Sequence, residues 1–286
     1  MKTFLDCIPC FFRQALATTK MTTDDEIVHR RVLNSVAFMI PELALDVTPP
    51  EIAQQVYRVV YEITGDSDPY CYAKRRADDL AMSFYPLMKD RVDYSDAPLK
   101  TACKLAIGGN AIDLGAQSEY GDMNTIIEES LNCTLNLDDY KLFKQNITDA
   151  SSILYIGDNA GEIVFDRILT EQILKINSNN IAYVVREKPI INDATIEDAG
   201  RVGLNKVVKV ISSGSEAPAT ILSQCSPEMK DLYNSADVII AKGQGNYESL
   251  FNSSENIFFF FKVKCPVIAR DSGYDVGTFA LIANSS

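Results

Sequence analysis

In the first third of the chain, apolar residues recur at intervals of three and four, the spacing that places them on one face of an α-helix. The runs "EIVHRRVLNSVAFMI" and "EIAQQVYRVVYEI" carry this pattern, and "LDVTPP" separates them. Two prolines suit the first turn of a helix, and Thr48 before them suits its cap. We therefore predict an all-helical N-terminal domain over residues 1–98.

The pattern changes after about Asp149, where short β-rich runs alternate with helical ones. The pairs are "SILYIG" with "GEIVFDRILTEQILKI", "NIAYVV" with "DATIEDAG", "KVVKVIS" with "APATILSQ", and "ADVIIAKG" with "NYESLF". Nearly continuous apolar strands between helices are typical of parallel sheets covered on both faces. The predicted fold class is therefore α/β, with a Rossmann-like, mainly parallel sheet in a domain over residues 99–286. Within it, residues 99–148 form a helical connection that packs at the site.

Polar residues follow each predicted strand. They are Asp158-Asn159 after the first, Asn192-Asp193 after the second, "SSGS" after the third and "KGQGN", from Lys242 to Asn246, after the fourth. Such sheets bind ligands beyond the carboxyl ends of their strands. Two carboxylates and an amide oxygen are hard donors that suit Mg²⁺ or Mn²⁺, and an ammonium with backbone N–H groups can offset a phosphate. Each piece alone could simply cap a helix or form a turn.

Composition narrows the function. The chain has 286 residues, of which 39 are acidic and 27 basic, giving a formal net charge of −12. This balance argues against a dedicated nucleic-acid binder, since clustered Lys and Arg hold phosphate backbones. No segment has 18 uninterrupted apolar residues and the N-terminus does not resemble a signal peptide, so we expect a cytoplasmic protein without a membrane partner. Seven scattered cysteines suit reduced thiols better than a disulfide framework.

Several motifs together resemble one family over nearly the whole chain. They are "GDNAGE", "INDAT", "KGQGNYESL", "GGNAIDLG", "DPY" followed by Lys74, and the N-terminal "CIPC". The set resembles the damage-control phosphatases, also catalogued as family 89 of the domains of unknown function and as ARMT1-like proteins, in their prokaryotic branch with a CxxC motif. The resemblance implies a metal-dependent phosphatase that hydrolyses small phosphomonoesters, such as sugar phosphates or phosphorylated cofactor precursors.

The resemblance also implies roles for particular residues. The metal ligands would be Asp158, Asn159 and Asp193, and the ion would be Mg²⁺, Mn²⁺, Co²⁺ or Ni²⁺. The catalytic residues would be Asp158, Asp193 and Lys242, with the Lys242 ammonium stabilising charge on the phosphoryl group. A small phosphorylated metabolite would be bound by Asn110, Asp113, Gly243 and Asn246.

Alternatives remain open at this stage. A nucleotide-cofactor enzyme, such as a methyltransferase or dehydrogenase, would share the sheet, although the expected G-x-G-x-x-G is absent. A non-catalytic metal- or anion-binding protein would share the pocket. Glu162 suits a helix N-terminus or a base near the metal, and the lone His29 suits a surface or packing role. Cys7 and Cys10 suit packing, a redox pair, or a metal contact completed from elsewhere.

Overall fold

The structure, a computed structural model, describes residues 1–111, 123–177, 180–253 and 255–284. Its α-helices are α1 (Ile8–Thr22), α2 (Glu26–Met39), α3 (Pro49–Thr64), α4 (Cys71–Asp93), α5 (Pro98–Gly109), α6 (Met123–Asn132), α7 (Leu137–Asp149), α8 (Glu162–Ile176), α9 (Ile196–Arg201), α10 (Pro227–Ser235), α11 (Gly243–Leu250) and α12 (Pro266–Ser272). Its strands are β1 (Ser152–Ile156), β2 (Asn180–Val185), β3 (Lys209–Ser212), β4 (Val238–Lys242), β5 (Ile257–Lys262) and β6 (Phe279–Asn284). None of the described helices is long and apolar enough to cross a membrane.

The strands form one sheet in the order β3-β2-β1-β4-β5-β6. All neighbouring strands are parallel except β6, which runs antiparallel to β5. The predicted α/β class with a mainly parallel sheet is therefore confirmed. Successive strands are added on one side of β1 as far as β3, and on the other side from β4 onward. Open α/β sheets bind ligands at such a switch point, which here lies between β1 and β4.

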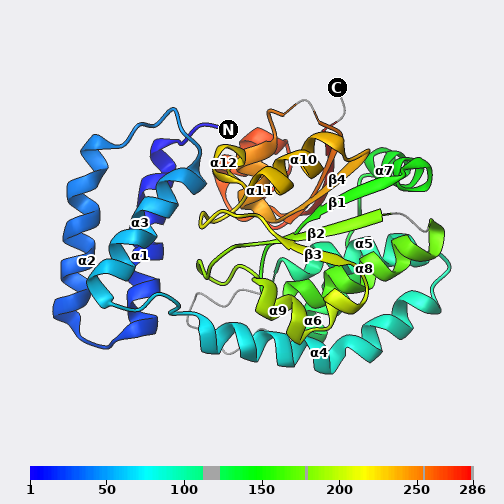
Figure 1. The fold of residues 1–286 in the computed structure, drawn as a ribbon, viewed down its shortest axis with the longest axis horizontal. Coiled ribbons are helices and arrows are strands. Elements are labelled where there is room, and N and C mark those ends of the chain that lie inside the picture. Colours follow the sequence, from blue (N-terminus) through cyan, green and yellow to red (C-terminus); the bar gives the residue numbers. More distant parts are fainter. Residues whose placement is uncertain (112–122, 178–179, 254, 285–286) are drawn as a thin grey trace.

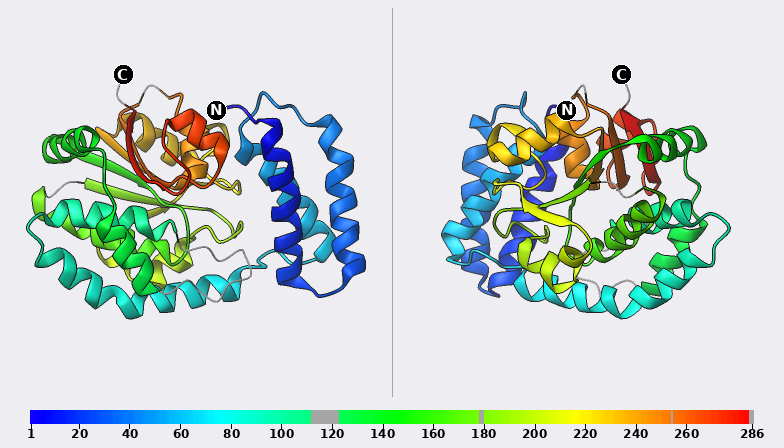
Figure 2. Two further views of the ribbon diagram at one scale, coloured as in Figure 1. Left: turned by 180° about the vertical axis from the view of Figure 1, so that it is seen from behind. Right: turned by 45° about the vertical axis from the view of Figure 1, so that its right-hand side comes forward.

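Helices cover both faces of the sheet (Figures 1 and 2). Alternate strand residues face opposite sides, so Tyr155 packs in a core with α4, α5, α7 and α8, whereas Ile156 packs in a core with α10, α11 and α12. Because both faces are buried, the strands are apolar throughout, which is why the sequence pattern identified them.

Helices α1, α2 and α3 stand beside the sheet and share an apolar core of their own (Figure 1). Helix α3 begins at Pro49, and Thr48 and Glu51 form the capping box at its start, as the prolines predicted. Ile190, from the loop after β2, packs into this core, so the carboxyl edge of the sheet faces the three helices. Helix α4 instead packs in the core beneath the sheet; the domain division at residue 98 stays a prediction.

One local expectation needs correction. The pattern predicts a helix over the run "APATILSQ", but only a single 3₁₀ turn forms there, at Leu222–Gln224. Pro218 within that run and the left-handed backbone of Ala219, with φ of 64°, prevent a regular helix.

Candidate active site at the ends of β1 and β4

The loops after β1 and β2 bring the predicted metal ligands together. Asn159 and Asp193 pair as an antiparallel β-bridge. On either side of this pair, the Ala160 amide donates to the Asn192 carbonyl at 2.9 Å, and the Ala194 amide donates to the Asp158 carbonyl at 2.8 Å. The prediction that Asp158, Asn159 and Asp193 lie side by side at the sheet edge therefore agrees with the geometry.

Two side-chain amides and one glycine position the Asp158 carboxylate. Its Oδ2 accepts hydrogen bonds from Asn159 Nδ2 at 2.8 Å and from Asn110 Nδ2 at 3.1 Å. Gly243 lies directly against it with φ of 81°, and a Cβ at that position would be 1.9 Å from Asp158 Oδ2. Glycine is required there because it tolerates the left-handed conformation and leaves room for the carboxylate.

Glu162 fixes the orientation of the side-chain amides of Asn159 and Asn110. It is fully buried, and its Oε2 accepts from Asn159 Nδ2 and Asn110 Nδ2, each at 3.0 Å. Since both donors of Asn159 point at carboxylates, its side-chain oxygen is the atom left to act as a ligand. Asn110 Oδ1 accepts from the Lys262 backbone amide at 3.2 Å. Asn110 therefore lies against the Asp158 carboxylate, and its role in substrate binding stays a prediction. Glu162 acts as more than a favourable charge at a helix N-terminus.

Lys242 is fully buried next to Glu162. Its Nζ lies 2.6 Å from both Glu162 Oε1 and Asp166 Oδ1, and it donates to the Ala106 carbonyl at 2.5 Å. Burial lowers the pKa of Lys242, but Asp166 and Glu162 outweigh it and raise that pKa, so the ammonium stays charged. A catalytic role for Lys242 stays a prediction; its ammonium is enclosed by these three oxygens.

Arg186, which the sequence analysis did not select, orients Asp193. It follows β2 and is 1% exposed, and its Nε lies 2.7 Å from Asp193 Oδ2. Its other nitrogens donate to Thr220 Oγ1 at 3.3 Å and to the Gly157 carbonyl at 3.5 Å. The signal for it was a charged residue directly after an apolar strand, "YVVRE", in a place where burial demands a partner.

The remaining predicted substrate residues divide into two cases. Asn246 is buried, and its Nδ2 donates to the carbonyls of Lys242, at 2.7 Å, and Gly157, at 3.3 Å, which ties β4 to β1. Its Oδ1 has no hydrogen-bond partner among the described residues. Asp113 lies outside the described residues.

The ionisable side chains at this site do not balance in formal charge. They are four carboxyl groups and two cations, namely Asp158, Glu162, Asp166, Asp193, Arg186 and Lys242. With all six groups ionised, four negative and two positive charges would leave an excess of two negative charges. Burial, and then the charges of Glu162 and Asp193, raise the pKa of Asp158 well above its usual range. Burial also raises the pKa of Asp193, although Arg186 lowers it.

A divalent cation would offset this excess, so the donor set fits the predicted ion. Two carboxylates and an amide oxygen are hard ligands, and hydrogen bonds hold each of the three side chains in place. No group of three or more His, Cys, Asp or Glu side chains in the described ranges is placed to hold a metal. The predicted donor set contains only two such side chains, Asp158 and Asp193, and its third member is the amide oxygen of Asn159.

Helix α4 contacts the loop that joins β1 to α8. Asp78 is fully buried, and its Oδ1 accepts from the Gly161 amide at 2.7 Å, at the start of α8. Its Oδ2 has no hydrogen-bond partner in the described part of the chain, and burial raises the pKa of Asp78 to about 7. Nearby, Lys74 pairs with Asp198 at 2.9 Å.

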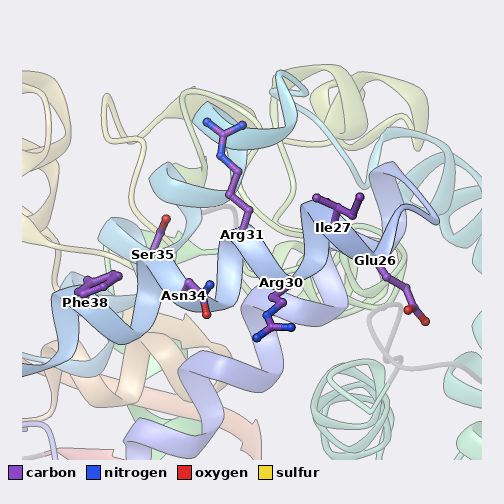
Figure 3. A pocket seen from close by; sticks show the side chains of 7 residues that line it. All are labelled: Glu26, Ile27, Arg30, Arg31, Asn34, Ser35 and Phe38. Carbon is purple, nitrogen blue, oxygen red and sulfur yellow. The ribbon is translucent and has the colours of Figure 1, made fainter.

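A hollow on α2 lies elsewhere (Figure 3). All of its lining residues belong to α2, namely Glu26, Ile27, Arg30, Arg31, Asn34, Ser35 and Phe38. It contains none of the strand-end residues described above. His29, on the same helix, has its Nε2 2.7 Å from the Thr23 carbonyl oxygen, which agrees with the expected packing role.

The CxxC pair lies at the start of α1. Cys7 and Cys10 are half-buried, and burial raises the pKa of both thiols. Raised pKa values keep the thiols protonated, whereas a nucleophilic cysteine needs the thiolate. The choice among packing, a redox pair and a metal contact stays open.

The fold and site define a Rossmann-like α/β protein whose switch point brings together carboxylate and amide side chains of the kind that suit a hard cation. The model of the damage-control phosphatase ARMT1-like domain matches residues 3–278, and the chain belongs to this family. A damage-control phosphatase of Pyrococcus horikoshii is 35% identical over 286 residues, covering 99% of each chain. A damage-control phosphatase of Archaeoglobus fulgidus is 34% identical over 277 residues, covering 95% of each.

A solved structure also matches closely. The crystal structure of a DUF89 family protein from Pyrococcus horikoshii superposes with a TM-score of 0.91 and 34% sequence identity, covering 100% of both chains. An uncharacterized protein of Methanocaldococcus jannaschii is 36% identical over 286 residues, covering 97% of this chain and 94% of its own. The sequence resemblance to the family is therefore confirmed.

Proposed function

We propose that this chain is a phosphatase that depends on a divalent metal ion and hydrolyses small phosphomonoesters. The observation that carries the proposal is the gathering of Asp158, Asn159 and Asp193 at the switch point, where Asn159 pairs with Asp193 and the charge of Asp193 acts on Asp158, among ionisable groups in which carboxyl groups outnumber cations by two. Family membership supports the hydrolytic activity, because relatives at about one-third identity are named damage-control phosphatases.

Asp158, Asn159 and Asp193 would hold the ion. When bound, a divalent ion polarises a phosphoryl oxygen and offsets negative charge at the reacting group. The surrounding residues fix the ligands before any substrate arrives: Glu162 orients the Asn159 amide and Arg186 orients Asp193. Such preorganisation matters because ligands that are already in place need not reorganise during the reaction.

The geometry argues against the nucleotide-cofactor alternative. Dinucleotide-binding sheets place a pyrophosphate at the N-terminus of the helix after the first strand. Here that helix is α8, and the Gly161 amide at its start already donates to Asp78 while Glu162 is buried in its first turn. Two carboxyl groups therefore lie where a pyrophosphate would need donors.

The test is hydrolysis of p-nitrophenyl phosphate and a panel of sugar phosphates, with added Mg²⁺, Mn²⁺, Co²⁺ or Ni²⁺ and with excess chelator. We expect turnover only with metal. Asp158→Ala and Asp193→Ala should each lower kcat/KM by about a thousandfold or more and weaken metal binding in a calorimetric titration. Asp231→Ala, on the exposed face of α10, is the control and should match the wild type.

Full turnover in excess chelator would remove the metal from the proposal. Wild-type metal affinity in either site variant would remove that residue from the ligand set. A wild-type protein that binds metal but hydrolyses none of the esters would favour the non-catalytic alternative.

A further inference from the structure

Three cysteines lie together where the helical bundle meets the sheet. Cys7 is the residue before α1, Cys10 lies in the first turn of α1, and Cys265 immediately precedes α12. All three side chains are half-buried, and a charge on Cys265 raises the pKa of both Cys7 and Cys10. The phosphatase chemistry proposed above uses none of these thiols.

The backbone holds Cys7 and Cys10 in one helical turn. Cys7 has φ of −78° and ψ of −24°, Ile8 has φ of −56° and ψ of −48°, and α1 continues through Cys10. Residues three apart in a helix share a face, and their Cα atoms are about 5 Å apart. Disulfides span Cα separations of about 4.4–6.8 Å, so the two thiols can be joined without unwinding α1.

A thiolate metal centre explains the cluster less well. Structural zinc sites use four ligands. Among the residues that the structure describes, no three His, Cys, Asp or Glu side chains are placed to hold a metal. Thiol–disulfide chemistry needs only two cysteines in the right geometry.

Cys265 is the competing partner for either thiol. Its Sγ accepts a hydrogen bond from Gln244 Nε2 at 3.7 Å, which holds it against α11. Gln244 Oε1 also accepts from the Lys264 amide at 3.0 Å, so the backbone beside Cys265 is tied to the same side chain. A disulfide with Cys265 would disturb these contacts, whereas one between Cys7 and Cys10 stays within a single turn of α1.

The surroundings of the pair favour a stable couple over a reactive one. Burial raises the pKa of both thiols, Glu248 and Cys265 add to this rise, and Arg13 acts against it at Cys10. Strongly oxidising disulfides depend on a stabilised thiolate in the reduced form, which is not the case here. The disulfide is therefore favoured once formed, and exchange is slow because little thiolate is present.

Cys7 lies where a change of redox state alters packing. Its side chain packs against both the core of α1–α3 and the core that contains α10, α11 and α12. A disulfide would draw its Sγ toward Cys10 and so change this packing. Helix α11, which α3 contacts, begins at Gly243 beside Asp158. The couple would therefore act at the junction next to the candidate active site.

We propose that Cys7 and Cys10 form a reversible thiol–disulfide couple that exchanges with low-molecular-weight disulfides. The thiolate of one cysteine attacks a small disulfide, RSSR, and releases one thiol, RSH. The other cysteine then attacks the mixed disulfide and releases the second RSH. Two protein S–H bonds and one RS–SR bond are replaced by one protein S–S bond and two RSH, so the pair loses two electrons that RSSR gains. The proposal does not rest on the phosphatase activity.

The experiment counts free thiols in the full chain. The protein is equilibrated at pH 8 in mixtures of reduced and oxidised glutathione, quenched with acid, unfolded and alkylated. Intact mass gives the number of alkyl groups, and peptide mapping identifies the pair. Cys7→Ser and Cys10→Ser each remove one partner, and Cys265→Ser removes the competitor. Cys71→Ser is the matched control, because Cys71 is also half-buried at the start of a helix.

The reduced wild type should take up seven alkyl groups, one on each of its seven cysteines, and the oxidised protein should take up two fewer. Excess reduced glutathione should restore all seven. Cys265→Ser and Cys71→Ser should form the same disulfide. Cys7→Ser and Cys10→Ser should only take up glutathione, at a ratio of oxidised to reduced glutathione about 100-fold higher, because the neighbouring thiol is missing.

Full alkylation at every glutathione ratio, or glutathione adducts without an internal disulfide, would overturn the proposal. A disulfide that maps to Cys265, or one that reduced glutathione does not reverse, would overturn it as well. Since the wild type alone gives each of these results, a variant that fails to fold leaves the test intact.

Discussion

The ends of β1 and β4 and the bundle of α1–α3 are built on opposite principles. The first region buries three carboxylates, a lysine and an arginine around the half-buried Asp158. The second has a core of apolar side chains such as Phe11, Val36 and Val56. Burying a charge is costly unless it is paired and hydrogen-bonded, whereas burying apolar surface is favourable in itself. The chain therefore concentrates buried charge near the ends of β1 and β4, where Lys242 and Arg186 lie against carboxylates.

The comparison also separates what a substitution should do in each region. In the helical bundle, a side chain matters through the area and volume that it fills. At the strand ends, a substitution removes one member of a buried charged pair. The charge that remains unpaired costs more free energy than a lost apolar contact. Three predictions test this difference.

The largest effect is expected for Lys242→Ala. It leaves Glu162 and Asp166 without their buried cation, so we expect the free energy of unfolding to fall by about 3–5 kcal/mol. Lys175→Ala is the matched control, because that lysine pairs with Asp93 at 2.7 Å but is 52% exposed, and it should cost at most about 1 kcal/mol. Urea unfolding measures both. If Lys242→Ala lowered the free energy of unfolding no more than Lys175→Ala does, the buried contacts of Lys242 with Glu162 and Asp166 would contribute little to stability.

Gly243→Ala should have the next largest effect, and Gly65→Ala is its control in the helical bundle. Both glycines have left-handed backbone, with φ of 81° and 74°, so both variants bear that strain. Only at Gly243 would the new Cβ meet the Asp158 carboxylate; at Gly65 nothing lies within 4 Å. We expect about 1–2 kcal/mol lost at Gly65 and about 2–4 kcal/mol at Gly243.

Measurements of activity separate Gly243→Ala from Gly65→Ala further. Gly243→Ala should reduce metal affinity and ester turnover, since Asp158 must move, while Gly65→Ala should leave both at wild-type levels. Calorimetry and steady-state kinetics on the folded variants give the answer. Normal turnover in Gly243→Ala would show that the position of Asp158 is not set by the close approach of the glycine.

The smallest effect concerns Asp78 and pH. Burial raises its pKa to about 7, so the folded protein favours the protonated form, while the unfolded chain ionises near pH 4. The stability due to this group is therefore greatest below pH 4 and is lost as pH rises toward 7, by up to about 2 kcal/mol between pH 5 and 7. Asp78→Asn keeps an acceptor for the Gly161 amide but cannot titrate.

Melting temperatures of the wild type and Asp78→Asn at pH 5, 6, 7 and 8 test this sign. The wild type should lose more stability than the variant as pH rises. Burial also raises the pKa of Glu248 to about 7, so some slope should remain in the variant. Parallel curves for the two proteins would contradict the shift assigned to Asp78.

The sequence by itself determined the order of most elements and which polar residues follow the strands. Apolar periodicity is a local property, so it located α3 with its Thr48 cap and the strands that carry Asp158 and Asp193. Parallel strands share one carboxyl edge, so the pattern alone predicts that those residues lie at the same edge of the sheet.

Only the tertiary structure decided which way each charged side chain points. Lys242 meets the carbonyl of Ala106, 136 residues away, and Asp78 meets the amide of Gly161, 83 residues away. Contacts between such distant segments leave no periodic trace in the sequence. They depend on how helices pack beneath the sheet, and on the need for each buried charge to find a partner once water is excluded.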